Sequence, residues 1–280
     1  MMSKSKNRGL TIALYTSYFL IVVVFLFPLF WVASVSLKTQ TELFEVPPSI
    51  WPSSWQFENY LHVLQTTPVL TYLWNSLRLV VLTVLVSLCI ALPAAFALSR
   101  FKMRGKNAFL LVILMTQMIS AVVISIPLYR LFASWNLLNN FLLILAIYVA
   151  VVLPIATWFM KNYFDTLPEQ MDEAAIIDGC NRWQLLTKIL LPVARPGIIS
   201  VVILVAVQSW SQFVIPFILI DDAALYPVSV GVVNLQSTQA QITTHYLAAG
   251  SIMSIVPVII LFLLLQKYIV GALTSGAVKG

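Results

Sequence analysis

Residues 173–179 read Glu-Ala-Ala-Ile-Ile-Asp-Gly, and after nine further residues positions 189–192 read Ile-Leu-Leu-Pro. Both segments lie in a polar loop, residues 161–197, that separates two strongly hydrophobic parts of the chain. This loop carries five of the chain's ten carboxylates, namely Asp165, Glu169, Asp172, Glu173 and Asp178. A protein that concentrates so much of its charge in one loop is expected to use that loop to hold a partner.

The composition is typical of an integral membrane protein. Of the 280 residues 60% are hydrophobic and only 9% are charged, whereas a soluble domain carries about 25% charged residues. Such a chain lacks the polar surface that a water-exposed globule needs. The two cysteines, Cys89 in an apolar run and Cys180 in the polar loop, form no metal-binding or redox pattern. We therefore expect neither a metal site nor a disulfide.

Six apolar segments are long enough to cross a bilayer, because a spanning helix needs about 20 residues. In lipid each segment must be helical, since no water is available to satisfy free backbone groups. The sequence therefore predicts an all-α integral membrane fold, a single transmembrane domain over residues 1–280 with six transmembrane helices. The predicted spans are residues 11–37, 71–98, 107–129, 137–160, 198–220 and 245–270.

The distribution of lysine and arginine predicts which ends of the spans face the cytoplasm. One side receives most of the cations, including a basic cluster at residues 100–106, whereas the other side receives Lys38 and Arg130. We therefore expect both termini and the 161–197 loop to be cytoplasmic. The basic cluster is interpreted as a topology determinant, and a patch for lipid or for a partner is the alternative.

The predicted spans hold almost no ionisable side chains apart from Arg78, near the outer end of the second span. A transporter driven by ions or protons normally keeps such groups at mid-membrane. The chain also lacks the glycine- and lysine-containing loop with which many proteins bind nucleotide phosphates. It is therefore not expected to be an enzyme, and energy for uphill transport would come from a partner bound to the polar loop. A stand-alone channel or facilitator is the alternative.

The polar loop is expected to form a helix-turn-helix at the membrane surface. Thr166 is typical of a helix start, and Gly179 can end that helix because glycine adopts a positive φ without steric cost. Asn181 repeats the capping pattern and predicts a second short helix that runs to Pro192.

The loop resembles the signature of the permease subunits of ABC importers, which reads Glu-Ala-Ala, three residues, Gly, nine residues and Ile-x-Leu-Pro. In that family the loop forms coupling helices that sit in a cleft of the ATPase subunit. The resemblance implies that ATP and Mg²⁺ bind to this partner and that the chain itself holds no cofactor. The residues assigned to ATPase coupling are Glu173, Ala174, Ala175, Asp178, Gly179, Ile189, Leu191 and Pro192.

Other parts of the chain resemble the sugar-importing branch of this family. Residues 28–31 (Pro-Leu-Phe-Trp) and 57–60 (Phe-Glu-Asn-Tyr) look like landmarks of that branch. Residues 271–280 are similar to the cytoplasmic tail of its maltose-type second permease, which reaches into the ATPase interface. A frayed terminus is the alternative. The tail residues implied in the ATPase contact are Thr274, Ser275, Gly276, Lys279 and Gly280.

The resemblance implies an importer of a sugar or oligosaccharide, surrounded by lipid in the cytoplasmic membrane of a bacterium or archaeon. The implied partners are a second, similar permease, two copies of the ATPase subunit and an extracellular or periplasmic solute-binding protein. No nucleic acid is expected. An importer for another small solute, such as glycerol phosphate or a polyamine, is the alternative.

Uncharged hydrogen-bonding and aromatic side chains, which suit a sugar, occur inside two predicted spans. Gln117 lies in the third span, and Gln208, Trp210 and Gln212 lie in the fifth. Buried polar groups need partners, so these side chains either face a substrate pathway or hold the helices together. The family's fifth span often reads Trp-Asn-x-Phe, but residues 210–213 read Trp-Ser-Gln-Phe. No substrate role is therefore transferred from the family.

Overall fold

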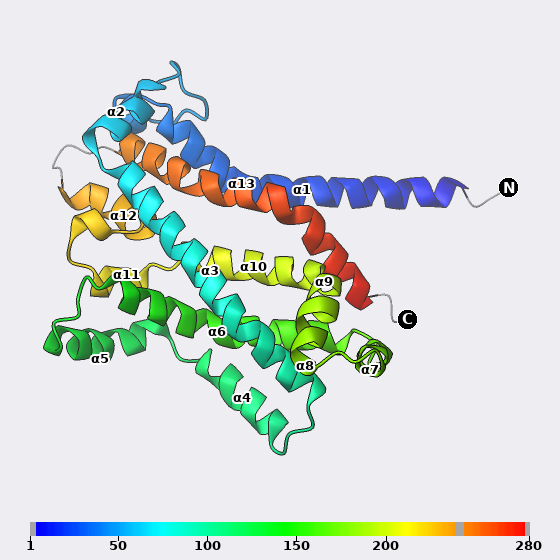
Figure 1. Ribbon diagram of the computed structural model, residues 1–280. Helices are drawn as coiled ribbons and strands as arrows, with labels where there is room; N and C mark the ends of the chain where they lie inside the picture. The colour runs from blue at the N-terminus through cyan, green and yellow to red at the C-terminus, as the bar shows by residue number, and fades with distance from the viewer. Residues whose placement is uncertain (1–3, 239–243, 278–280) are drawn as a thin grey trace. The chain divides into compact units, whose positions relative to one another are not determined.

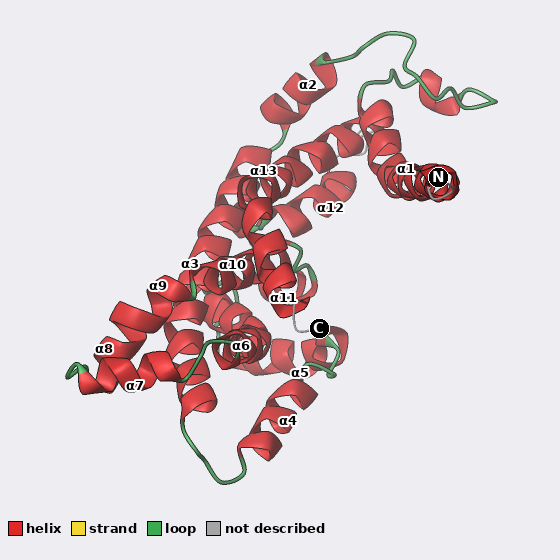
Figure 2. Ribbon diagram, turned by 90° about the vertical axis from the view of Figure 1, so that its right-hand side faces the viewer, coloured by secondary structure: helices red, strands yellow, loops and turns green. Residues whose placement is uncertain are grey.

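The polypeptide consists of helices and loops in the part that the computed structural model describes, residues 4–238 and 244–277 (Figures 1 and 2). No strand occurs among these residues. The predicted all-α fold is therefore confirmed, as expected for apolar segments whose backbone groups must bond within their own helix.

Four long helices carry apolar stretches of membrane-spanning length. They are α1 (Lys4–Ser36), α3 (Val69–Arg100), α6 (Phe141–Asp165) and α13 (Thr244–Ala277). Each contains a proline, namely Pro28, Pro93, Pro154 and Pro257. Apolar membrane helices tolerate proline where neighbouring groups satisfy the freed carbonyl. The apolar stretch of α13 ends at Leu264, and the helix itself continues beyond the predicted span boundary at residue 270.

Two bent pairs of helices are also long and apolar enough together for a broken span or a re-entrant loop. Helices α4 (Lys106–Thr116) and α5 (Ala121–Ser134) meet at 82°, and the segment Arg182–Val193 meets α10 (Arg195–Trp210) at 81°. When each bent pair is counted as one crossing, the described residues provide six.

The expectation that residues 107–129 and 198–220 form continuous helices is wrong. The first segment is interrupted at residues 117–120, where the Ser120 hydroxyl accepts a hydrogen bond from the Val122 amide at 3.3 Å and starts α5. The second is interrupted after Trp210, before the short helix α11 (Val214–Leu219). Pro216 explains this break, because it has no N–H to donate to the Gln212 carbonyl four residues earlier.

Contacts divide the chain into two compact units, which are described separately. The first comprises residues 1–69 and 232–255. In it, Val63 of α2 (Glu58–Thr66) packs against Ala249 of α13. The Asn59 amide donates hydrogen bonds to the carbonyls of Ser36 at 2.9 Å and Lys38 at 3.0 Å. These bonds fix the connection after α1, which contains the 3-10 helix η1 (Glu42–Phe44).

The second unit comprises residues 70–231 and 256–280. Helix α10 packs along α6, and both contribute to a buried cluster with α3, which we call the main core. Asn75 of α3 donates to the carbonyl of Ala224, in the 3-10 helix η3 (Ala223–Leu225), at 2.8 Å. The next residue, Ser76, accepts from the amide of Val228, the first residue of α12 (Val228–Thr238), at 2.8 Å. The main core includes Ala91, Ala95, Ala156, Met160, Phe164, Val201 and Val205.

The close approach of α10 to α6 depends on Gly197. A Cβ at this position would lie 2.5–2.6 Å from ring atoms of Tyr163, and an aromatic ring packed between helices cannot move aside easily. The substitution Gly197→Ala is expected to destabilise the chain by about 1–3 kcal/mol through overpacking. The measurement is the thermal unfolding midpoint of the purified chain in detergent.

The control for this prediction is Gly250→Ala in α13. There the new Cβ would lie 3.2 Å from a terminal methyl group of Leu235, which can move with its side chain. An unfolding midpoint for Gly197→Ala no lower than that of Gly250→Ala would contradict the proposed helix contact.

Candidate functional site

The polar loop forms two helical segments in the second unit, as predicted. They are α7 (Gln170–Ile177) and a segment made of α8 (Arg182–Gln184), η2 (Leu185–Leu190) and α9 (Leu191–Val193). The predicted start of the first helix at Thr166 is wrong, because α6 continues to Asp165. Thr166 instead caps the end of α6, and its hydroxyl donates to the carbonyl of Tyr163 at 2.7 Å.

The turn after α7 has the conformation predicted for Gly179, with a φ of +85°. The Cys180 amide donates to the carbonyl of Ala175 at 2.9 Å, and the Gly179 amide donates to the carbonyl of Ile176 at 3.0 Å. These two hydrogen bonds form a Schellman motif. A Cβ at position 179 would meet no atom within 4 Å. The backbone conformation, and not a lack of space, therefore favours glycine here.

Asn181 begins the second segment, as predicted. Its side-chain oxygen accepts a hydrogen bond from the Gln184 amide at 2.8 Å, and the Gln184 side chain accepts one from the Asn181 amide at 2.9 Å. This reciprocal arrangement is a capping box. The segment then continues as the π-helix η2, in which the Leu191 amide bonds to the carbonyl of Leu186 five residues earlier.

The residues predicted for coupling divide into an exposed set and a packed set. Ala175, Ile189 and Leu191 pack into the main core together with buried leucines of η2. They hold the two helical segments against α3, α6 and α10. The exposed residues are Glu173, Ala174, Asp178, Gly179 and Pro192.

Two isoleucines that the sequence analysis did not single out extend the exposed face of α7. Ile176 is 43% exposed and Ile177 is 84% exposed. They lie beside Ala174, whose small side chain permits close approach, and Glu173, whose carboxylate makes no hydrogen bond or ion pair in the described part of the chain. Consecutive isoleucines in the middle of a polar loop were the available signal. An apolar face next to a free carboxylate is suited to docking against another protein.

A buried ion pair, also missed from the sequence, holds α7 to the end of α3. The Nε atom of Arg100 lies 2.5 Å from Oδ2 of Asp172, and the two side chains are 5% and 10% exposed. The terminal nitrogens of the same guanidinium donate to the carbonyls of Phe164 at 3.0 Å and Leu167 at 3.2 Å. One arginine therefore joins the ends of α3 and α6 to the start of α7.

Asp165 adds a second and more exposed link at this place. It accepts a hydrogen bond from the Ser99 hydroxyl at 2.7 Å and pairs with Lys161 at 2.5 Å. Its side chain is 38% exposed, so water screens this pair more than the pair between Arg100 and Asp172.

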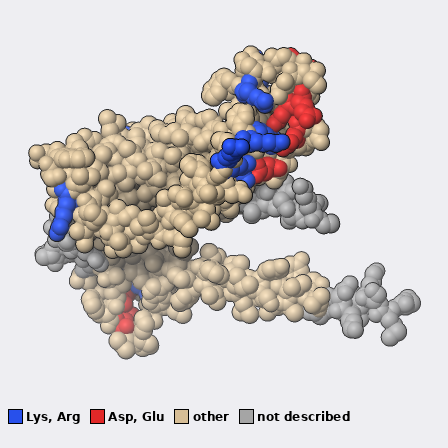
Figure 3. All heavy atoms as spheres, turned by 90° about the horizontal axis from the view of Figure 1, so that it is seen from below, with Lys and Arg blue, Asp and Glu red and all other residues tan. Residues whose placement is uncertain are grey.

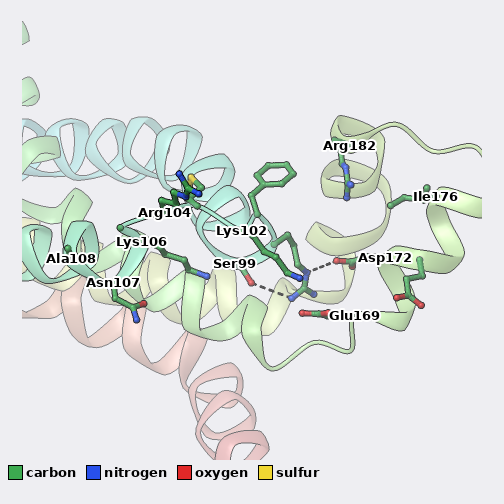
Figure 4. Close-up of a pocket in the computed structure, with 15 residues that line it drawn as sticks. Ser99, Lys102, Arg104, Lys106, Asn107, Ala108, Glu169, Asp172, Ile176 and Arg182 are labelled. Carbon is green, nitrogen blue, oxygen red and sulfur yellow. Dashed lines mark hydrogen bonds and ion pairs between the residues drawn. The ribbon is translucent and has the colours of Figure 1, made fainter.

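A cleft of about 780 Å³ opens beside the buried ion pair. Figure 4 shows Lys102, Arg104 and Lys106 on the side of the α3–α4 connection, with Glu169 and Arg182 on the side of the polar loop. In the view of Figure 3, basic and acidic side chains gather side by side on one part of the surface, and much of the remaining visible surface carries neither.

A smaller pocket of about 200 Å³ lies at the break between α10 and α11. The Gln212 carbonyl, which the helix cannot use, accepts hydrogen bonds from the Tyr148 hydroxyl at 3.4 Å and the Ser229 hydroxyl at 2.8 Å. Side chains of α6 and α12 thus provide the hydrogen bonds that this carbonyl lacks because of the break between α10 and α11. The pocket is lined by Tyr148, Val151, Val152, Gln208, Ser209, Ser211 and Gln212.

The predicted pathway residues are only partly brought together by this pocket. Gln208 and Gln212 line it, and the Gln117 side chain donates at 3.0 Å to the carbonyl of Val151, another lining residue. Trp210 is not among the lining residues. The hydroxyl of Ser209 is buried there and has no hydrogen-bond partner among the described residues.

The C-terminal residues predicted to contact a partner fall partly on a helix. Thr274, Ser275 and Gly276 lie in the last turns of α13, which ends at Ala277. The predicted tail, residues 271–280, is therefore helical as far as Ala277, and its contact with an ATPase stays a prediction. Lys279 and Gly280 lie outside the described residues.

Residues 87–274 match the family described as binding-protein-dependent transport system inner membrane component. The probable ABC transporter permease protein YurM of Bacillus subtilis is 33% identical over 94% of this chain and 86% of its own length. The trehalose/maltose transport system permease protein MalG of Thermococcus litoralis is 32% identical over 93% of this chain and 94% of its own length.

A solved structure shares the fold. It is a chain of a bacterial ABC transporter involved in the import of the acidic polysaccharide alginate, with 23% identity and a TM-score of 0.75. The match covers 96% of this chain and 98% of that chain.

Proposed function

Because the chain belongs to the family of binding-protein-dependent transport system inner membrane components, we propose that it is the permease subunit of an ATP-driven importer for a sugar or oligosaccharide. It is a multi-pass transport subunit and not an enzyme. The observation that carries the proposal is the exposed face of α7, where Glu173, Ala174 and Ile177 are presented between a Schellman turn and a buried ion pair.

Helix α7 is the element that would enter a cleft of the ATPase subunit. ATP and Mg²⁺ would bind to that partner, with no cofactor held by this chain. When the ATPase subunits close, the displacement of α7 would reach two spans at once, because Arg100 bonds the start of α7 to the ends of α3 and α6. Those spans would then change from an inward-open to an outward-open arrangement.

The importer would contain further chains. Two copies of the ATPase need two coupling surfaces, and each permease offers one such loop, so we propose a second, similar permease beside this one. A solute-binding protein would deliver the substrate at the opposite face. In this proposed arrangement both termini and the polar loop would lie in the cytoplasm, and the spans would lie in the cytoplasmic membrane of a bacterium or archaeon.

The pocket between α10 and α11 supports an uncharged, hydroxyl-rich substrate. Its polar side chains are amides and hydroxyls, including the unpartnered Ser209 hydroxyl, and no charged side chain lines it. Gln208 and Gln212 can each donate and accept hydrogen bonds. The name of the trehalose/maltose permease relative also supports an uncharged sugar.

The proposal is tested by co-expressing the chain with candidate ATPase and partner permease subunits and purifying through a tag on this chain. ATPase activity is then measured with and without binding protein and a panel of sugars. Stimulation by one sugar, dependent on the binding protein, is the expected result. Transport by the purified chain alone, with no ATPase recovered, would instead identify a stand-alone facilitator.

A further inference from the structure

The cleft beside α7 has an excess of positive charge that the protein does not neutralise. Five cationic and three acidic side chains line it. Arg100 and Asp172 pair with each other, and Glu169 and Glu173 remain on the α7 side. Among the described residues no carboxylate lies within ion-pair distance of the other cations. These cations are Lys102, Arg104, Lys106 and Arg182.

The length of α3 indicates how deep the cleft lies relative to a bilayer. Between Arg78 and Arg100 the helix has no lysine, arginine, aspartate or glutamate. The 22 steps from Arg78 to Arg100 span about 33 Å at the helical rise per residue, close to the hydrocarbon thickness of about 30 Å. With Arg78 at the outer edge of the hydrocarbon and α3 along the bilayer normal, Arg100 would lie at the inner edge and residues 101–105 at the level of the lipid headgroups.

The first turn of α4 adds main-chain donors to the same cleft. Gly105 precedes it with a φ of +79° and provides no side-chain cap. The amides of Asn107 and Ala108, two lining residues, make no hydrogen bond within the described part of the chain. Free amides at a helix start favour an anion such as phosphate, and here they stand beside unpaired basic side chains.

An apolar surface continues from the cleft along α4. Phe109, Leu111 and Val112 are 56%, 55% and 58% exposed. Phe101 and Met103, in the wall of the cleft itself, are 38% and 44% exposed. A site with phosphate donors at the headgroup level and apolar side chains leading into the membrane matches an amphiphile rather than a soluble anion.

We propose that this cleft binds the headgroup of an anionic phospholipid from the leaflet at this end of α3. The lipid phosphate would contact Lys102, Arg104 and the free amides of α4, and the acyl chains would lie along the apolar face of α4. The excess positive charge selects a lipid with net negative charge over a zwitterionic one. Arg182, stacked over Phe101 with 5.6 Å between guanidinium and ring centre, brings the polar loop to the same headgroup.

The test uses the purified full-length chain in nanodiscs of phosphatidylcholine that contain either spin-labelled phosphatidylglycerol or spin-labelled phosphatidylcholine. Electron paramagnetic resonance gives the fraction of each labelled lipid that the protein immobilises. The wild-type chain is expected to prefer phosphatidylglycerol. The double variant K102Q/R104Q is expected to lose roughly tenfold in this preference, because each basic residue near a headgroup contributes substantially to binding.

The matched control is K188Q/R195Q. It removes one lysine and one arginine from exposed positions in the polar loop that do not line the cleft, and it is expected to keep most of the preference. Higher salt should weaken the wild-type preference, because ions screen these charges.

Three results would overturn the proposal. Equal immobilisation of the two lipids by the wild-type chain, or an unchanged preference in K102Q/R104Q, excludes a lipid site in this cleft. Loss of the preference on adding inorganic phosphate, but not on adding chloride at the same ionic strength, identifies a site for soluble anions. A variant that keeps the lipid preference but no longer co-purifies with an ATPase shows that the cleft meets an acidic protein surface.

Discussion

The substitution Glu173→Arg is expected to abolish substrate-stimulated ATP hydrolysis by the assembled importer and to leave the chain itself folded. Glu173 is exposed in the first turn of α7 and has no partner among the described residues. Its carboxylate is therefore available for an arginine of the ATPase. Removing one partner of a buried interface charge pair costs about 2–5 kcal/mol, and reversing the charge adds repulsion. Binding should weaken roughly 30-fold to several thousand-fold.

The measurement compares ATPase recovery and sugar-stimulated ATP hydrolysis for the variant and the wild-type complex at equal expression. Glu58→Arg is the matched control, because Glu58 is also an exposed glutamate in the first turn of a short helix, α2, far from the polar loop in sequence. Normal coupling in Glu173→Arg would refute the docking of α7.

The substitution Arg100→Leu is expected to lower the free energy of unfolding by about 3–5 kcal/mol, because it leaves the carboxylate of Asp172 buried without its partner. It also leaves the carbonyls of Phe164 and Leu167 without the guanidinium that bonds them. The start of α7 should then detach from α3 and α6. Denaturant titration of the purified chain in detergent, with proteolysis of the 161–197 loop as a second measurement, provides the test.

Two comparisons make this prediction specific. Lys161→Leu breaks the more exposed pair with Asp165 and should cost about 1 kcal/mol or less. The double variant R100L/D172L removes both buried charges and should be more stable than Arg100→Leu alone, because an apolar pair often replaces a buried ion pair at little cost. Strictly additive effects of the two single substitutions would argue against the ion pair.

Local chemistry explains why the turn and the second helical segment of the polar loop could be predicted. Gly179 adopts the left-handed conformation that glycine permits, and Asn181 and Gln184 cap each other's amides within three residues. The same reasoning failed at Thr166. A threonine at this position can cap either the end of one helix or the start of the next. In the structure its hydroxyl donates to the carbonyl of Tyr163, three residues earlier, and so caps the end of α6.

The interactions that cross the fold were not predictable from one sequence. Arg100 and Asp172 are separated by 71 residues, and a lysine- and arginine-rich segment after a span already has an explanation in membrane topology. The breaks at residues 117–120 and 211–213 were missed for a different reason. Hydropathy measures whether a segment is long and apolar enough to cross a bilayer, and it does not measure whether the helix is continuous.

The π-helix η2 sets the rotational phase of the segment that follows it. Successive residues of an α-helix are turned by about 100° around the axis, and a π-turn accommodates one residue more than an α-turn. If the same residues closed as an ordinary α-helix, Leu191 would swing away from the main core by about that angle, whereas deleting one residue of η2, such as Thr187, would remove the π-turn and keep the phase of Leu191. The π-turn therefore accommodates nine residues between Gly179 and Ile189 while Leu191 keeps its packing against the main core.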